Sequence, residues 1–170
     1  MPETFQEYSA RLLGLAAGDD PLSILAGTPA RIQSLIGSRS VADLQRPPGP
    51  DRWSIAQILS HLADAEIVFA YRIRMILASP GTQIQAYDQN AWSRAQHAEK
   101  SDPHASLALL RAIRASMIPL LSGLNDEELD RYGMHAERGK ESVRHLLSLY
   151  AGHDRNHLAQ IERIVAEHGA

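Results

Sequence analysis

Apolar residues recur at helical spacing along most of this chain, and that pattern constrains its fold more than any other feature. No segment alternates apolar and polar residues convincingly enough to predict a β-strand. Four long helices are predicted: from Pro21 to about Gly37, from Ser54 to the stop at residues 79–81, from Asp102 to about Leu124, and from Ser142 to about His168. With one long crossover connection near residues 82–100, they indicate an all-α fold, a four-helix bundle.

The predicted helix starts carry residues that satisfy free backbone N–H groups. Asp20 and Asp102 each precede a proline, which is favoured at the first helical position because its missing N–H costs nothing there. Ser54 with Gln57 forms a capping-box pattern. Shorter helices are expected over residues 4–17, near 88–98 and just after Asn125. Proline inside two of the long helices, at positions 29 and 119, predicts a kink or break there.

Length and composition bound the class of protein. The 170 residues, 44% of them hydrophobic and 22% charged, fit a single globular domain over residues 1–170, with a helical extension at residues 1–19. The net charge of −3, without a basic stripe, argues against a nucleic-acid partner. We see no 18-residue apolar run for a membrane span and no apolar signal core. The chain has no cysteine, which fits a cytoplasmic location and leaves no thiolate ligand or nucleophile.

The last predicted helix turns polar side chains toward its own core. His153, Asp154 and His157 interrupt the middle of its apolar stripe, which then resumes. Side chains four apart on a helix are neighbours, so His153 and His157 have the spacing of a metal chelate. The spacing alone is common, and two histidines hydrogen-bonded in a polar seam would explain it as well.

A metal site would need a third ligand from another helix. His61 flanks the apolar stripe of the second long helix and is the best candidate. Asp64 lies one turn further on, where a solvated residue is expected rather than a direct ligand. Glu66 falls within the apolar face, where a buried salt bridge to an arginine (72, 114 or 155) competes with a role at the site. Asp154 or Glu66 could orient a ligand histidine through its second ring nitrogen.

The remaining histidines are expected at the surface, in loops or at helix ends: His97, His104, His135, His145 and His168. Of these, His135 lies in a polar loop, residues 131–141, which could approach a substrate. That loop and the 80–100 connection are the expected walls of a pocket, because loops carry specificity.

Two segments together make the chain resemble the DinB-like family of four-helix bundles, which includes the bacillithiol-transferase-like proteins. They are "RWSIAQILSHLADAE", residues 52–66, and "SVRHLLSLYAGHDRNHLAQIERI", residues 142–164; "AYDQNAWSRA", residues 86–95, is also similar. The resemblance covers roughly residues 22–166. It implies a divalent metal held by one histidine of the first segment and two of the second, which are His61, His153 and His157 here. It also implies thiol-dependent transfer or isomerisation in some relatives, and frequent homodimers.

Three imidazoles leave a metal partly uncovered, which favours a catalytic or substrate-binding site over a closed structural one. Such a metal activates water or lowers the pKa of a small thiol supplied as cosubstrate. Zinc or nickel is expected first, and iron or manganese also suits imidazole. The first hypothesis is therefore a metal-dependent hydrolase or thiol S-transferase acting on a small molecule. The alternatives are a non-catalytic metal- or small-ligand-binding protein related to the stress response, and a metal-free bundle with a buried polar seam.

Overall fold

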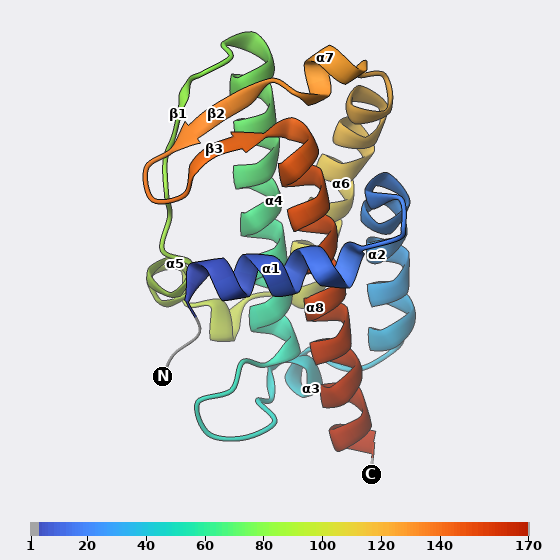
Figure 1. Cartoon of the computed structure of the whole chain (residues 1–170). Helices are drawn as coiled ribbons and strands as arrows, with labels where there is room; N and C mark the ends of the chain where they lie inside the picture. Colours follow the sequence, from blue (N-terminus) through green and yellow to red (C-terminus); the bar gives the residue numbers. More distant parts are fainter. Residues whose placement is uncertain (1–3, 170) are drawn as a thin grey trace.

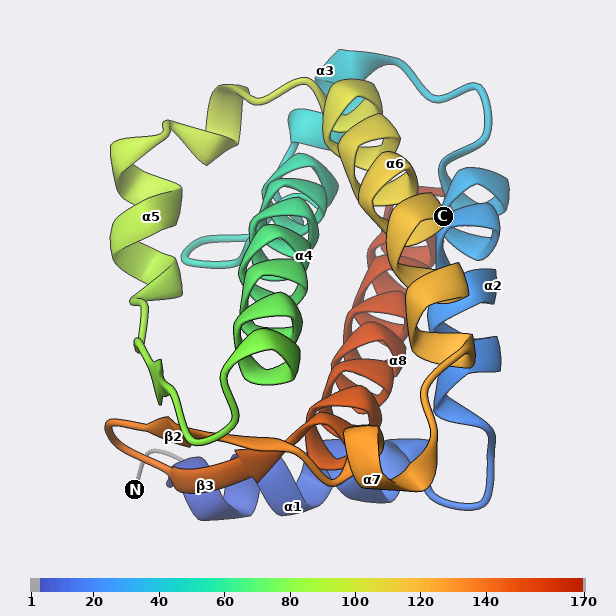
Figure 2. The same ribbon diagram turned by 90° about the horizontal axis from the view of Figure 1, so that it is seen from above.

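In the computed structural model, which describes residues 4–169, four long helices form a bundle (Figure 1). They are α2 (Pro21–Ile36), α4 (Ile55–Ala78), α6 (Pro103–Ser122) and α8 (Val143–Gly169). Figure 2 shows them at the four corners, with α2 diagonal to α4 and α6 diagonal to α8. Among these four helices, the most extensive contacts join α2 to α8 and α4 to α6. The predicted four-helix bundle is confirmed.

One long crossover sets the helix directions. Helices α4 and α6 run the same way, opposite to α2 and α8, so the chain between them must return along the length of the bundle (Figure 1). This connection holds β1 (Gln83–Ile84), α5 (Gln89–Ala95) and a 3₁₀ turn, Ala98–Lys100. It lies beside α4 and forms an outer wall there (Figure 2).

Most predicted helix starts are confirmed. The side chains of Asp20, Ser54 and Asp102 accept hydrogen bonds from backbone N–H groups of the first turn, and Ser54 completes a capping box with Gln57. The short helices α1 (Phe5–Ala16) and α7 (Asp126–Leu129) also begin at capping boxes. The sequence analysis did not foresee α3 (Val41–Gln45), a single turn before the 46–53 connection.

The expectation that the chain contains no strands was wrong. β1, β2 (Tyr132–His135) and β3 (Gly139–Ser142) form a small sheet in which β2 pairs parallel to β1 and antiparallel to β3. The predicted polar loop at 131–141 is therefore a hairpin. Strands of two to four residues are too short to show a reliable alternation, and pairing with a distant segment is what orders them.

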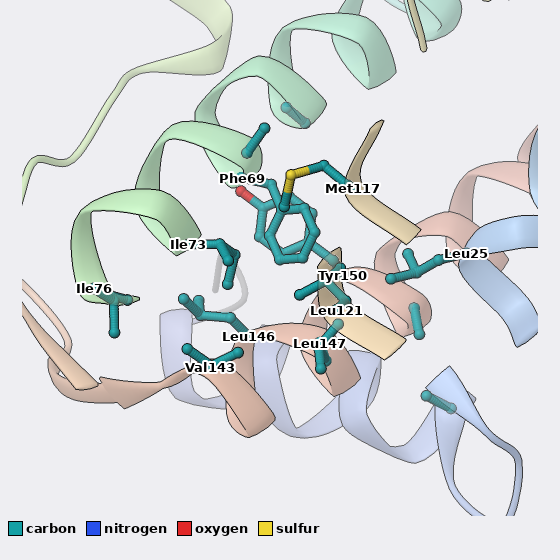
Figure 3. Packing of buried hydrophobic residues seen from close by; sticks show 14 of the residues in the cluster. Leu25, Phe69, Ile73, Ile76, Met117, Leu121, Val143, Leu146, Leu147 and Tyr150 are labelled. Carbon is teal, nitrogen blue, oxygen red and sulfur yellow. The ribbon is translucent and has the colours of Figure 1, made fainter. Parts of the chain in front are cut away.

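Two apolar clusters fill the bundle. The first packs Phe69 of α4 on Tyr150 of α8, with ring centroids 4.3 Å apart, among aliphatic side chains of all four long helices (Figure 3). The second lies toward the other end and includes Ile58 of α4 and Ile161 of α8. Each long helix contributes to both clusters, so the residues between the clusters form a separate layer.

Proline 29 does not break α2, which continues from Pro21 to Ile36. Because proline has no N–H, the carbonyl of Leu25 one turn earlier loses its usual helical partner. The guanidinium of Arg114 on α6 donates to that carbonyl instead, at 2.5 Å. Likewise Pro119 lies within the continuous helix α6. A tertiary hydrogen bond thus replaces the backbone bond that Pro29 removes.

One helix among residues 4–169, α6, is long and apolar enough by length and composition to cross a membrane. It contains Arg111 and Arg114, so it is not the uninterrupted 18-residue apolar run that a membrane span would favour. In the fold α6 packs against α4 and α2, and its Arg114 is buried in ion pairs. This packing buries Leu107, Leu110, Met117 and Leu121 of α6 in the bundle.

Helix α1 crosses the outside of α8 (Figure 1), and Gly152 permits the close approach. A Cβ atom at this glycine would overlap the carbonyl group of Leu12 on α1. The obstacle is backbone, so it cannot be relieved by a side-chain rotation. The contact fixes α1 over the middle of α8.

We expect Gly152→Ala to lower the free energy of unfolding by about 1–3 kcal/mol, because overpacking forces the helices apart. Urea denaturation checks this. The matched controls are Gly14→Ala and Gly27→Ala, which add the same methyl group at helical glycines with open space around them. These controls should be neutral or slightly stabilising. Equal stability of Gly152→Ala and the controls would show that the crossing does not need a glycine.

Candidate metal centre

A polar layer separates the two apolar clusters. It comprises His61 and Glu66 of α4, Arg114 of α6, and the three interrupting residues of α8: His153, Asp154 and His157. All six side chains are buried. Buried polar groups cost free energy unless they find partners, so the contacts within this layer decide its role.

The three histidines converge although 92 residues separate the first two. Nε2 of His61 lies 2.9 Å from Nε2 of His153, and the candidate ligand atoms of all three rings lie within 4.8 Å of one another. Two nitrogen ligands of a tetrahedral metal are about 3.3 Å apart, given metal–nitrogen distances near 2.05 Å. Small ring rotations would bring the three nitrogens to that spacing. The donor set and its spacing therefore fit a divalent metal such as zinc.

Burial keeps these rings neutral. It lowers the pKa of His61 to about 3, with the His157 ring adding to the effect. Burial is also the main reason that the pKa of His153 and that of His157 are lowered. Neutral imidazole is the form that binds a metal, because its unprotonated nitrogen carries the lone pair.

Gln160 orients one ligand. Its Oε1 lies 3.0 Å from Nδ1 of His157 and accepts the ring proton, which leaves the Nε2 lone pair of His157 free to bind a metal. Trp53 packs against the His61 ring, with ring centroids 5.3 Å apart. The sequence analysis missed Gln160. Its position one turn after His157 was the available signal, because residues three apart on a helix can pair.

Glu66 and Asp154 were predicted to orient the ligand histidines. Both instead form ion pairs with Arg114. Nε of Arg114 lies 2.7 Å from Oε2 of Glu66, and its two terminal nitrogens lie 2.9 and 3.2 Å from the Asp154 oxygens. A buried carboxylate gains more from a charged guanidinium than from a neutral imidazole. The salt-bridge alternative for Glu66, with arginine 114 among the candidate partners, is the arrangement observed.

This trio carries one cation and two carboxylates, and Glu66 is its weaker member. The Glu66 oxygens have no well-aligned hydrogen bond within residues 4–169, despite the short ion pair. Burial raises the pKa of Glu66 to about 7, and Arg114 only partly offsets this. Near neutral pH, the Glu66 carboxyl is therefore only partly ionised.

Asp64 is half-buried, hydrogen-bonds to Gln96 and is not among the clustered candidate ligands; burial raises its pKa. Among the other histidines, His97 and His104 are exposed, and His145 and His168 are partly exposed. His135 departs from the surface expectation, because the β2–β3 hairpin buries it.

An open cavity of about 160 Å³ reaches His153. Helices α1, α4 and α8 form part of its wall, and the 86–89 segment and the β2–β3 turn complete it. The pocket walls predicted from the 80–100 connection and the 131–141 segment are thus confirmed. The wall from α1, which includes Tyr8 and Leu12, was not foreseen because its position depends on the crossing at Gly152.

Known proteins resemble this chain in sequence. Residues 24–161 match the profile of the DinB superfamily. A Bacillus subtilis protein named "Putative metal-dependent hydrolase YfiT" is 28% identical over 86% of this chain and 83% of its own length. An Oceanobacillus iheyensis protein, "Putative metal-dependent hydrolase OB0413", is 26% identical over 78% of this chain and 76% of its own.

A solved structure gives the same fold. It is described as "YfiT from Bacillus subtilis is a probable metal-dependent hydrolase with an unusual four-helix bundle topology". It is 27% identical, superposes with a TM-score of 0.81, and the match covers 88% of this chain and 86% of that one.

His157→Ala should abolish tight binding of one equivalent of Zn²⁺, because two imidazoles seldom hold zinc alone. Gln160→Ala should weaken binding about 10- to 100-fold, the usual effect of losing a ligand-orienting partner. Elemental analysis of tag-free protein and chelator competition measure both. The control is His104→Ala, which removes an exposed imidazole of α6. Wild-type affinity in His157→Ala would contradict the three-histidine site.

The raised pKa of Glu66 predicts that the difference in stability between wild type and Glu66→Gln depends on pH. A pKa raised to about 7 in the folded state stabilises the fold below about pH 4.5, and this contribution is lost as pH rises toward 7. Relative to Glu66→Gln, wild type should therefore lose roughly 2–3 kcal/mol of unfolding free energy between pH 4.5 and 7.5.

Urea denaturation of both proteins across this range measures the difference, in which the common histidine contributions cancel. Glu127→Gln, at an exposed glutamate of α7, is the control and should show little pH-dependent difference. A flat difference for Glu66→Gln would mean that Arg114 keeps Glu66 ionised throughout.

Proposed function

Because this chain belongs to the DinB superfamily, we propose that it is a divalent-metal-dependent enzyme of the hydrolase type that acts on a small molecule. The observation that carries the proposal is the convergence of three buried, neutral imidazoles, one of which, His153, lines an open cavity. The relatives named as metal-dependent hydrolases support the same reaction class. Zinc or nickel is the proposed metal, since both suit imidazole ligands.

Bound at His61, His153 and His157, the metal would supply Lewis acidity and an activated water. The protein's own groups shape what reaches it. Tyr150 lines the cavity beside His153, and burial raises its pKa to about 12. Its hydroxyl therefore stays protonated and can donate a hydrogen bond to negative charge on a substrate oxygen.

The cavity wall also restricts the access of water and the size of the substrate. Apolar side chains from three helices, including Leu12 and Leu149, line it beside the polar groups. A volume of about 160 Å³ accommodates only a small molecule or one end of a larger one. This favours a small-molecule substrate over a folded polymer.

The test is hydrolysis of a panel of small esters, amides and lactones by tag-free protein loaded with Zn²⁺ or Ni²⁺. We expect turnover that disappears with a chelator, returns with metal, and is absent in His157→Ala. A parallel panel adds small thiols to electrophilic partners. Metal- and thiol-dependent conjugation without hydrolysis would replace the hydrolase with the S-transferase alternative. Stoichiometric metal without turnover in either panel would favour the non-catalytic metal-binding protein.

A further inference from the structure

The cavity beside the histidines holds an arginine that lacks an acidic partner. Arg72 of α4 is only 4% exposed and lines this cavity. Among residues 4–169 it forms no ion pair, and its Nε has no hydrogen-bond partner. Its recorded polar contacts are a hydrogen bond to the carbonyl of Gln85, at 2.6 Å, and an approach to His135.

A buried guanidinium without a carboxylate is costly, and this fold otherwise avoids it. Arg114 has two carboxylate partners, and Arg138, which also lines the cavity, forms a bidentate pair with the buried Glu141. Arg72 is therefore the buried cation in this cavity whose charge the described residues do not balance.

His135 adds a second donor at the same place. Its Nδ1 accepts the backbone N–H of Glu137, at 3.2 Å, so the proton of the neutral ring is on Nε2. That nitrogen lies 3.5 Å from a terminal nitrogen of Arg72. Two donors side by side cannot satisfy each other. Both are suited to an acceptor between or beside them.

The position on α4 relates Arg72 to the histidines. Arg72 follows His61 by 11 residues. At 100° per residue, this rotation brings Arg72 to within about 20° of the direction of His61 around the helix axis. The two Cα atoms are about 16 Å apart along the axis, and long helical side chains lean back toward the N-terminus. His153 and Arg72 line one cavity, so a single ligand can reach both ends.

We propose that Arg72 is the anion-binding residue of this cavity, and that the substrate carries a carboxylate or phosphate group several bonds from the atom presented to the metal. This inference rests on the proposed function and narrows its substrate class to anionic small molecules. The guanidinium binds the two oxygens of such a group as a fork, and Nε–H of Arg72 supplies one of the donors.

The experiment measures binding of monohydroxamates of α,ω-alkane dicarboxylic acids to Zn²⁺-loaded protein by calorimetry. The hydroxamate binds the metal, and the chain length sets the reach to Arg72. Each probe has a matched neutral analogue that ends in a primary amide, and a matched phosphonate. We expect one chain length at which an anionic end binds about 10- to 100-fold more tightly than the amide. Carboxylate and phosphonate arms identify which anion is preferred.

Arg72→Gln should remove this preference while the protein still binds one equivalent of Zn²⁺, which shows that the fold and metal site are intact. Arg72→Lys should restore part of it. Arg74→Gln removes the same charge two residues away, where the side chain contacts Ser116 of α6, and should keep the preference.

Equal affinity of anionic and neutral probes for wild type at every length would overturn the inference while leaving the metal site standing. So would a preference that persists in Arg72→Gln. If the protein takes up no metal, the proposed function fails, and inorganic phosphate binding to metal-free protein becomes the test. Binding that depends on Arg72 then supports the anion site, and its absence overturns it.

Discussion

The polar layer across the middle of the bundle is the feature on which the rest of this structure depends. Three of the four long helices, α4, α6 and α8, place polar side chains at that level, and each buried polar group there would cost about 1–3 kcal/mol without a partner. Arg114 is the partner of most of these polar groups, because it binds two carboxylates and the carbonyl that Pro29 leaves free. The three histidines remain as neutral rings, which can hydrogen-bond to one another or bind a metal.

The shorter elements around the bundle form the cavity through which small molecules can reach this layer. Helix α1 crosses α8 at Gly152, one residue before His153, and forms one wall of the cavity. The crossover and the small sheet form the opposite walls and bury His135 beside Arg72. The bundle thus supplies ligands from two rigid helices, whereas the shorter segments determine what can approach them. This division is common where a rigid scaffold carries variable loops.

The helical part of the fold was predictable because its signals are local. Capping residues such as Ser54 and Asp102 act within one turn, and apolar spacing is read along a single helix. The short strands were not predictable, since residues 83–84 become ordered only by pairing with residues 134–135. The outcome at Pro29 was not predictable from local signals either. Of the kink or break expected there, the break does not occur, because a distant arginine satisfies the free carbonyl and α2 remains continuous.

For the site, the sequence by itself determined which residue types were available: two histidines one helical turn apart, a third on another helix, and no cysteine. These facts follow from spacing and composition. Only the tertiary structure decided which carboxylate meets which arginine, that Gln160 holds the His157 ring, and that Arg72 faces the cavity without an acid. Partner choice in a buried layer depends on distances between helices far apart in sequence, and electrostatic energies change steeply with distance and burial. No local pattern encodes those distances.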